Sequence, residues 1–80
     1  MKHQGHFKRA DPVREAMQTR TLIADISRII DILNVDIASE EQAAGVADVA
    51  RSEYPALARA LRARRDNLVE TVSALQQRLS

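Results

Sequence analysis

Residues 21–33, with the sequence TLIADISRIIDIL, constrain the fold of this chain more than any other segment. Their apolar residues recur at spacings of three and four, which places them on one face of an α-helix. The members of this stripe are Leu22, Ile23, Ile26, Ile29, Ile30 and Leu33. Because most helical stability in proteins comes from packing of such a face, the segment predicts that a second helix packs against it.

The first helix is expected to run from about Pro12 to Leu33. Asp11 is a favourable N-cap residue, and proline is favoured at the first helical position. Asn34 suits a left-handed residue at the end of a helix, which predicts a short turn over residues 34–38.

A second helix is predicted to begin at Ser39, because residues 39–42 (SEEQ) match a capping box. The short turn would make this helix antiparallel to the first. Its side chains are mostly small, and Gly45 lies within it at a cost of up to ~1 kcal/mol. That glycine either permits a close helix crossing or is simply tolerated.

Pro55 cannot donate a backbone hydrogen bond, which favours a break or kink at residues 52–54 with Ser52 as a new N-cap. A continuous kinked helix remains an alternative. The predicted fold class is therefore all-α: an antiparallel helical hairpin with a kink or break near Pro55. This gives three helical segments that assemble as a helical bundle.

After Pro55 a heptad seam, with the alternating spacings of a coiled coil, continues to the end of the chain. Its members are Tyr54, Ala58, Leu61, Arg65, Leu68, Val72, Leu75 and Leu79. A helix starting at Ser39 and as long as the first would end near residue 61, which leaves the later seam without a partner in its own chain. The sequence therefore predicts a homodimer whose interface is formed by Leu61, Arg65, Leu68, Val72, Leu75 and Leu79.

The length, charge and composition of the chain limit the class of protein to which it can belong. The chain has 80 residues, a net charge of +1 and no cysteine, which fits a single small domain without disulfides. Residues 1–10 are expected to form a disordered basic arm, and residues 11–80 a single helical domain. No apolar run reaches the ~20 residues of a membrane span, so we expect no membrane association and a cytoplasmic location.

Little in the sequence points to catalysis. The only glycines are Gly5 and Gly45, so glycine-rich phosphate loops are absent. His3 and His6 both lie in the arm, where two histidines without further ligands make a poor metal site. We therefore expect neither an enzyme, nor a cofactor, nor a bound metal.

A cluster of arginines in the last segment admits two interpretations. Its members are Arg59, Arg62, Arg64 and Arg65. They could contact an anion or nucleic acid, or they could form a solvated face with Arg62 and Asp66 paired four residues apart. Tyr54 is expected at the edge of the core, with its hydroxyl reaching solvent.

We therefore expect a protein–protein interaction module, such as a small adaptor, regulatory or structural helical-bundle protein, that acts as a homodimer. Another helical protein is the alternative partner. The alternative function is a small nucleic-acid-associated regulator that uses the basic arm and the Arg59–Arg65 cluster.

Overall fold

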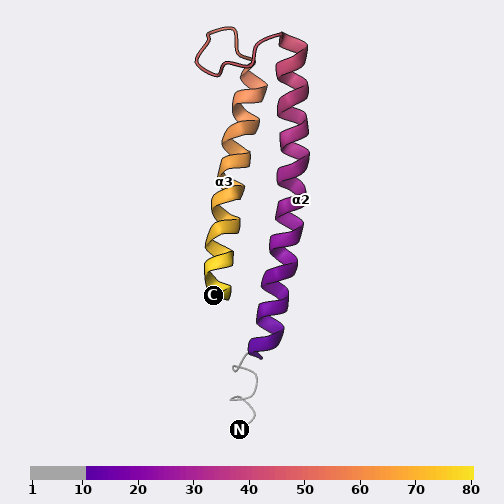
Figure 1. Cartoon of the computed structure of the whole chain (residues 1–80), viewed down its shortest axis with the longest axis vertical. Helices are drawn as coiled ribbons and strands as arrows, with labels where there is room; N and C mark the ends of the chain where they lie inside the picture. Colours follow the sequence, from indigo (N-terminus) through magenta and orange to yellow (C-terminus); the bar gives the residue numbers. More distant parts are fainter. Residues whose placement is uncertain (1–10) are drawn as a thin grey trace, which may run out of the picture.

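The computed structural model describes residues 11–80 and shows two helices that pack against each other. Helix α2 spans Pro12–Ala44, and helix α3 spans Ala56–Leu79. Figure 1 shows the helices side by side and antiparallel, joined at one end by a loop, with α2 extending past the C-terminal end of α3. The predicted all-α class is confirmed, with two helices that pack against each other. No strand occurs within residues 11–80.

The start of α2 follows the predicted signals. Asp11 adopts an extended backbone conformation, and its carboxylate accepts a hydrogen bond of 3.0 Å from the backbone N–H of Val13. This bond satisfies one of the N–H groups that a helix leaves unpaired at its start. Pro12 is the first helical residue, where its missing N–H costs nothing.

The predicted turn at residues 34–38 is wrong, because α2 continues through it as one helix of 33 residues. Asn34 costs less than ~1 kcal/mol in a helix interior. Continuing the helix buries Ile37, which is 4% exposed. Ser39 therefore lies inside α2, and the predicted capping box does not start a helix.

Gly45 ends α2, a role that the sequence interpretation did not assign to it. It has a φ of 71°, in the left-handed region that favours glycine. Its N–H donates to the carbonyls of Gln42 and Glu41, and the N–H of Val46 donates to the carbonyl of Glu41. These bonds satisfy the last carbonyls of the helix in the pattern of a Schellman motif.

Residues 45–55 form a loop, so residues 11–80 contain two helical segments and not the three that were predicted. Two turns shape its second half: the N–H of Arg51 donates to the carbonyl of Asp48, and that of Tyr54 donates to the carbonyl of Arg51, each at 3.1 Å. Pro55 precedes α3 in an extended conformation, and Ser52 does not cap the helix. The predicted break or kink between two helical segments at residues 52–54 is not confirmed, because the segment before Pro55 is not helical.

The two helices meet along two seams. On α2 the seam recurs every three or four positions, and each of its members is buried or half-buried; they are Ala16, Thr19, Ile23, Ile26, Ile30, Leu33 and Ile37. On α3 the corresponding residues are Ala58, Leu61, Arg65, Leu68, Val72, Leu75 and Leu79. The second set is the predicted heptad seam, which packs within the chain.

The hydrophobic core is small. Within residues 11–80 the buried apolar residues are Leu33, Ile37, Tyr54, Ala58 and Leu75. Most of them lie toward the loop end of the hairpin, where Tyr54 covers the junction of the two helices. No helix in the described part of the chain is both long enough and apolar enough to cross a membrane.

Candidate interaction surface

A polar cluster closes the loop end of the hairpin. The Tyr54 hydroxyl donates a hydrogen bond of 2.7 Å to Glu41 Oε2 on α2. Arg62 on α3 donates from Nε to the Tyr54 hydroxyl oxygen at 2.7 Å, and from its terminal nitrogen to Glu41 Oε2 at 2.8 Å. The three side chains therefore link both helices to the loop in a closed triangle.

Burial of the tyrosine makes this triangle more than a surface ion pair. Tyr54 is 4% exposed, and the side chains of Glu41 and Arg62 are 16% and 32% exposed. The hydrogen bond from Tyr54 and the guanidinium of Arg62 lower the pKa of Glu41 below its usual value. The hydrogen bond to the Glu41 carboxylate is the main cause that raises the pKa of Arg62, and the hydrogen bond to Tyr54 raises it further. The expectation that the Tyr54 hydroxyl reaches solvent is wrong.

The arginine cluster divides into members with different surroundings. Arg62 is held by Glu41, so the predicted pairing of Arg62 with Asp66 is wrong. Arg65 donates to Asn34 Oδ1 at 2.6 Å and to Asp66 Oδ1 at 2.7 Å. Both residues thus donate hydrogen bonds to acceptors within the chain, which favours a structural role for them.

The other two arginines are exposed. The guanidinium of Arg59 lies 5.2 Å from the centre of the Tyr54 ring, at the distance of a cation–π contact. Arg64 forms no ion pair with any of residues 11–80. Five positions separate Arg59 from Arg64, so they point in different directions from a helix with 3.6 residues per turn. The four arginines do not form one continuous basic patch on α3.

The residues assigned to a dimer interface lie on the face of α3 that packs against α2. They are Leu61, Arg65, Leu68, Val72, Leu75 and Leu79, and all are buried or half-buried in the single chain. The premise for their assignment is wrong: because α2 continues to Ala44, it covers the seam that was expected to lack a partner. A homodimer remains a prediction, and these six residues are the weaker candidates for its interface.

The structure divides the apolar stripe of residues 21–33 into two sets. Ile23, Ile26, Ile30 and Leu33 belong to the seam of α2. Leu22 and Ile29 lie beside the seam and remain 46% and 40% exposed, and Ile32 is 60% exposed. One α3 helix is too narrow to cover the whole stripe, so α2 offers an apolar surface that sequence reasoning took for internal core.

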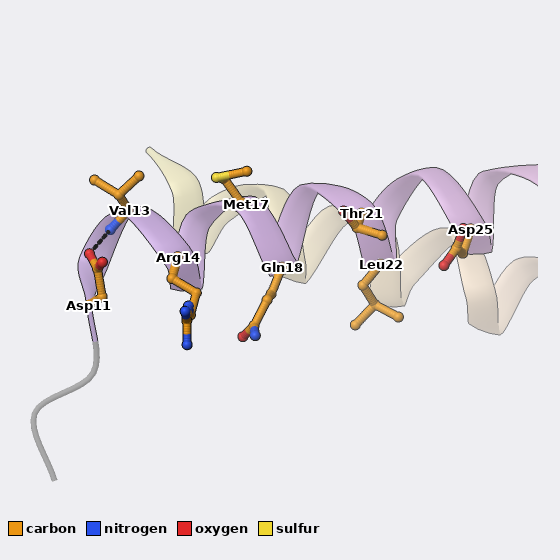
Figure 2. A pocket seen from close by; sticks show the side chains of 8 residues that line it. All are labelled: Asp11, Val13, Arg14, Met17, Gln18, Thr21, Leu22 and Asp25. Atoms are coloured by element: carbon orange, nitrogen blue, oxygen red, sulfur yellow. Dashed lines mark hydrogen bonds between the residues drawn. The ribbon is translucent and has the colours of Figure 1, made fainter. Parts of the chain in front are cut away.

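Two shallow depressions lie on the N-terminal part of α2. Figure 2 shows one of them, whose lining side chains come from Asp11 and α2 alone; Val13 and Met17 point to one side of the helix, and Arg14, Gln18 and Leu22 to the other. A surface formed by one helix cannot enclose a small ligand. The other depression lies between the helices, and its lining includes Glu15, Leu22, Leu75 and Arg78.

Metal ligands do not gather in the part of the chain that can be described. Among residues 11–80, no group of three or more histidine, cysteine, aspartate or glutamate side chains could hold a metal ion. His3, His6 and the predicted basic arm lie outside the described residues.

Comparisons of the chain with protein-family models, with curated proteins and with solved structures found no match. A function can therefore be inferred only from the residues and contacts described above.

Proposed function

We propose that this chain is a protein–protein interaction module: a helical hairpin that associates with a second copy of itself to form a four-helix bundle. The observation that carries the proposal is the imbalance between buried and exposed apolar side chains. Only five apolar residues are buried within residues 11–80, whereas eight large apolar side chains are exposed. Those eight are Val13, Met17, Leu22, Ile29, Ile32, Val35, Leu57 and Val69.

Physical size makes this imbalance significant. A chain of 80 residues has a high ratio of surface to volume, and this one lacks disulfides that could compensate for a small core. Burying one large apolar side chain contributes roughly 1.5–3 kcal/mol. Covering several of the exposed side chains in a second hairpin would therefore add stability comparable to that of the core itself.

The polar features of the chain support association more than catalysis or nucleic-acid binding. Three polar side chains, those of Glu41, Tyr54 and Arg62, bond to one another and join the loop to both helices. Such a cluster stiffens a scaffold, and a stiff hairpin associates with a smaller loss of conformational entropy.

Light scattering after size-exclusion chromatography tests the proposal. At micromolar concentration we expect a mass of twice 8.9 kDa, the mass of one chain. Circular dichroism on the same sample should show a helical protein with cooperative thermal unfolding. A folded monomer that unfolds cooperatively, with a midpoint independent of concentration, would contradict the proposal.

A further inference from the structure

One flank of the hairpin differs from the other in composition. Every second seam residue is preceded by a residue that lies at the edge of the seam, so these edge positions repeat every seven residues. On α2 they hold Glu15, Leu22, Ile29 and Asp36. On α3 they hold Leu57, Arg64, Thr71 and Arg78. In an antiparallel pair of helices these positions lie on the same side. The depression shared by Glu15, Leu22 and Arg78 shows that they do so here. We call this side the open flank.

The opposite flank is already occupied by polar contacts. Glu41 on α2 bonds Arg62 on α3 there, and Asn34 accepts a hydrogen bond from Arg65. No comparable bond between side chains crosses the open flank within residues 11–80. The open flank is therefore the side on which α2 and α3 leave their side chains free for another surface.

Most of the apolar surface of the open flank lies on α2. The α2 edge holds Leu22 and Ile29, and Ile32 lies about one turn further along the same helix; all three are exposed. The α3 edge holds one exposed large apolar residue, Leu57 near the loop, and the exposed residues next to it include Ala60 and Ala74.

Charge is separated between the two edges. Acidic residues on or next to the α2 edge are Glu15, Asp25 and Asp36, whereas the basic residues of the α3 edge are Arg64 and Arg78; all five are exposed. Asp25 also pairs with Arg28, and the other four form no ion pair with any of residues 11–80. The α2 edge is therefore acidic and the α3 edge basic.

Two arrangements can place one open flank on another with two-fold symmetry. If the axis runs parallel to the helices, α2 of each copy lies on α3 of the other. If the axis runs across the helices, α2 lies on α2 and α3 on α3. The second arrangement brings acidic edges together and basic edges together, and like charges in contact disfavour association. The first brings the acidic residues of the α2 edge to the arginines of the α3 edge.

From this complementarity we propose that a second copy of the chain docks on the open flank, with α2 of each copy packed on α3 of the other. The inference rests on the proposed function and specifies its partner surface. All neighbouring helices in the resulting four-helix bundle are antiparallel, an arrangement common in such bundles. The contacts of Glu41 with Arg62 and of Asn34 with Arg65 set the register. An axis parallel to the helices keeps this register, so Ile29 lies level with Thr71 of the second copy.

Cross-linking between two different single-cysteine variants tests the arrangement, because the natural sequence has no cysteine. A disulfide requires the two Cα atoms to lie within roughly 7 Å. When Ile29→Cys and Thr71→Cys proteins are mixed, denatured, refolded together and mildly oxidised, we expect disulfide-linked heterodimers to be the main product. Mixing separate variants prevents a disulfide within one chain. The control is a mixture of Val35→Cys and Thr71→Cys proteins. Val35 is exposed on the far side of α2, so this mixture should not cross-link.

The possible results separate the two proposals. Covalent homodimers of Ile29→Cys as the main product would show α2 against α2 and overturn this inference while leaving the dimer intact. Light scattering that finds a folded wild-type monomer would overturn the proposed function as well. If the wild type is a dimer but the Ile29→Cys and Thr71→Cys proteins form no disulfide-linked product, the interface lies elsewhere and this inference is also overturned.

A pair of charge insertions checks the same surface without cysteines. We expect the double variant Leu22→Glu and Ile29→Glu to halve the mass measured by light scattering. The matched double variant Met17→Glu and Val35→Glu changes side chains that are more exposed, at 60% and 68%, and lie away from the open flank. It should remain dimeric. The reverse pattern would show that the dimer uses the other face of α2.

Discussion

The hydroxyl of Tyr54 and the carboxylate of Glu41 lie 2.7 Å apart, although thirteen positions separate the two residues in the chain. This contact joins the end of the loop to the last turns of α2. It also explains how an irregular segment of eleven residues can lead back to a defined start of α3. The tyrosine ring is buried, and its oxygen also accepts a hydrogen bond from Arg62.

Replacing Tyr54 with Phe removes the hydroxyl and keeps the buried ring. We expect the free energy of unfolding to fall by about 1.5–3 kcal/mol, as for a hydrogen bond that involves a charged partner. The measurement is urea denaturation at one fixed protein concentration. Tyr54→Ala should cost distinctly more, because it also leaves a cavity. Equal losses in the two variants would show that the ring contributes little and that the core is misassigned.

The lowered pKa of Glu41 makes part of the stability depend on pH. In the unfolded chain this carboxyl takes up a proton near its usual value of 4.5, but in the folded chain it does so only at lower pH. Its contribution is therefore complete above pH 4.5 and is lost as the pH falls through the folded-state value.

The corresponding experiment compares the wild type with Glu41→Gln in urea titrations from pH 7 to pH 3. We expect the wild type to be more stable at pH 7 and the difference to shrink as the solution becomes more acidic. Other carboxylates titrate equally in both proteins and cancel in the comparison. A difference that is constant with pH would show that the charge of Glu41 contributes nothing.

Gly45 permits a test of the helix end. Its φ of 71° strains any residue with a side chain, but no atom lies within 4 Å of where a Cβ would be placed. Gly45→Ala should therefore lower the free energy of unfolding by about 1 kcal/mol through backbone strain alone. Gly45→Asn should cost less, because asparagine tolerates the left-handed region. Thermal unfolding followed by circular dichroism measures both; a much larger loss in alanine would indicate a steric clash.

Arg65 is the charged member of the α3 seam, with a side chain that is 23% exposed. We expect Arg65→Leu to preserve the helical fold and to raise the stability by about 1 kcal/mol, because leucine buries apolar surface without desolvating a charge. The variant should also select its oligomeric state less strictly, since single polar residues on a seam specify the number of helices. Light scattering would then show a mixture of sizes. A clear loss of stability would mean that the bond to Asn34 outweighs the apolar gain.

Nucleic-acid binding, the alternative function, is tested by titrating duplex DNA at increasing salt concentrations. Binding through phosphate contacts weakens steeply as the salt concentration rises. We expect no binding of this kind. The physical reason is that Arg62 and Arg65 already donate to acceptors of their own chain. Tight binding that weakens steeply with salt, and that is lost in Arg59→Ala or Arg64→Ala, would revive the alternative.

Local signals in the sequence were sufficient for several features of this fold. The start of α2 at Pro12 depends on a capping residue and a proline, whose effects act within a few residues. The seam from Ala58 to Leu79 depends on a regular spacing, which constrains which face of a helix must pack whatever its partner is. For these features, the local sequence and the tertiary contacts favour the same structure.

Only the tertiary structure decided between signals that compete. Residues 34–38 carry turn and cap residues that would end a helix in isolation, yet the burial of Ile37 and the bond from Arg65 to Asn34 favour its continuation. The triangle of Glu41, Tyr54 and Arg62 joins residues with no shared periodicity, so no spacing could predict it. Leu22 and Ile29 look like core residues in the sequence and remain exposed because a single partner helix covers only part of a wide stripe. In each case the outcome depends on which surface a side chain meets, and that surface comes from a distant part of the chain.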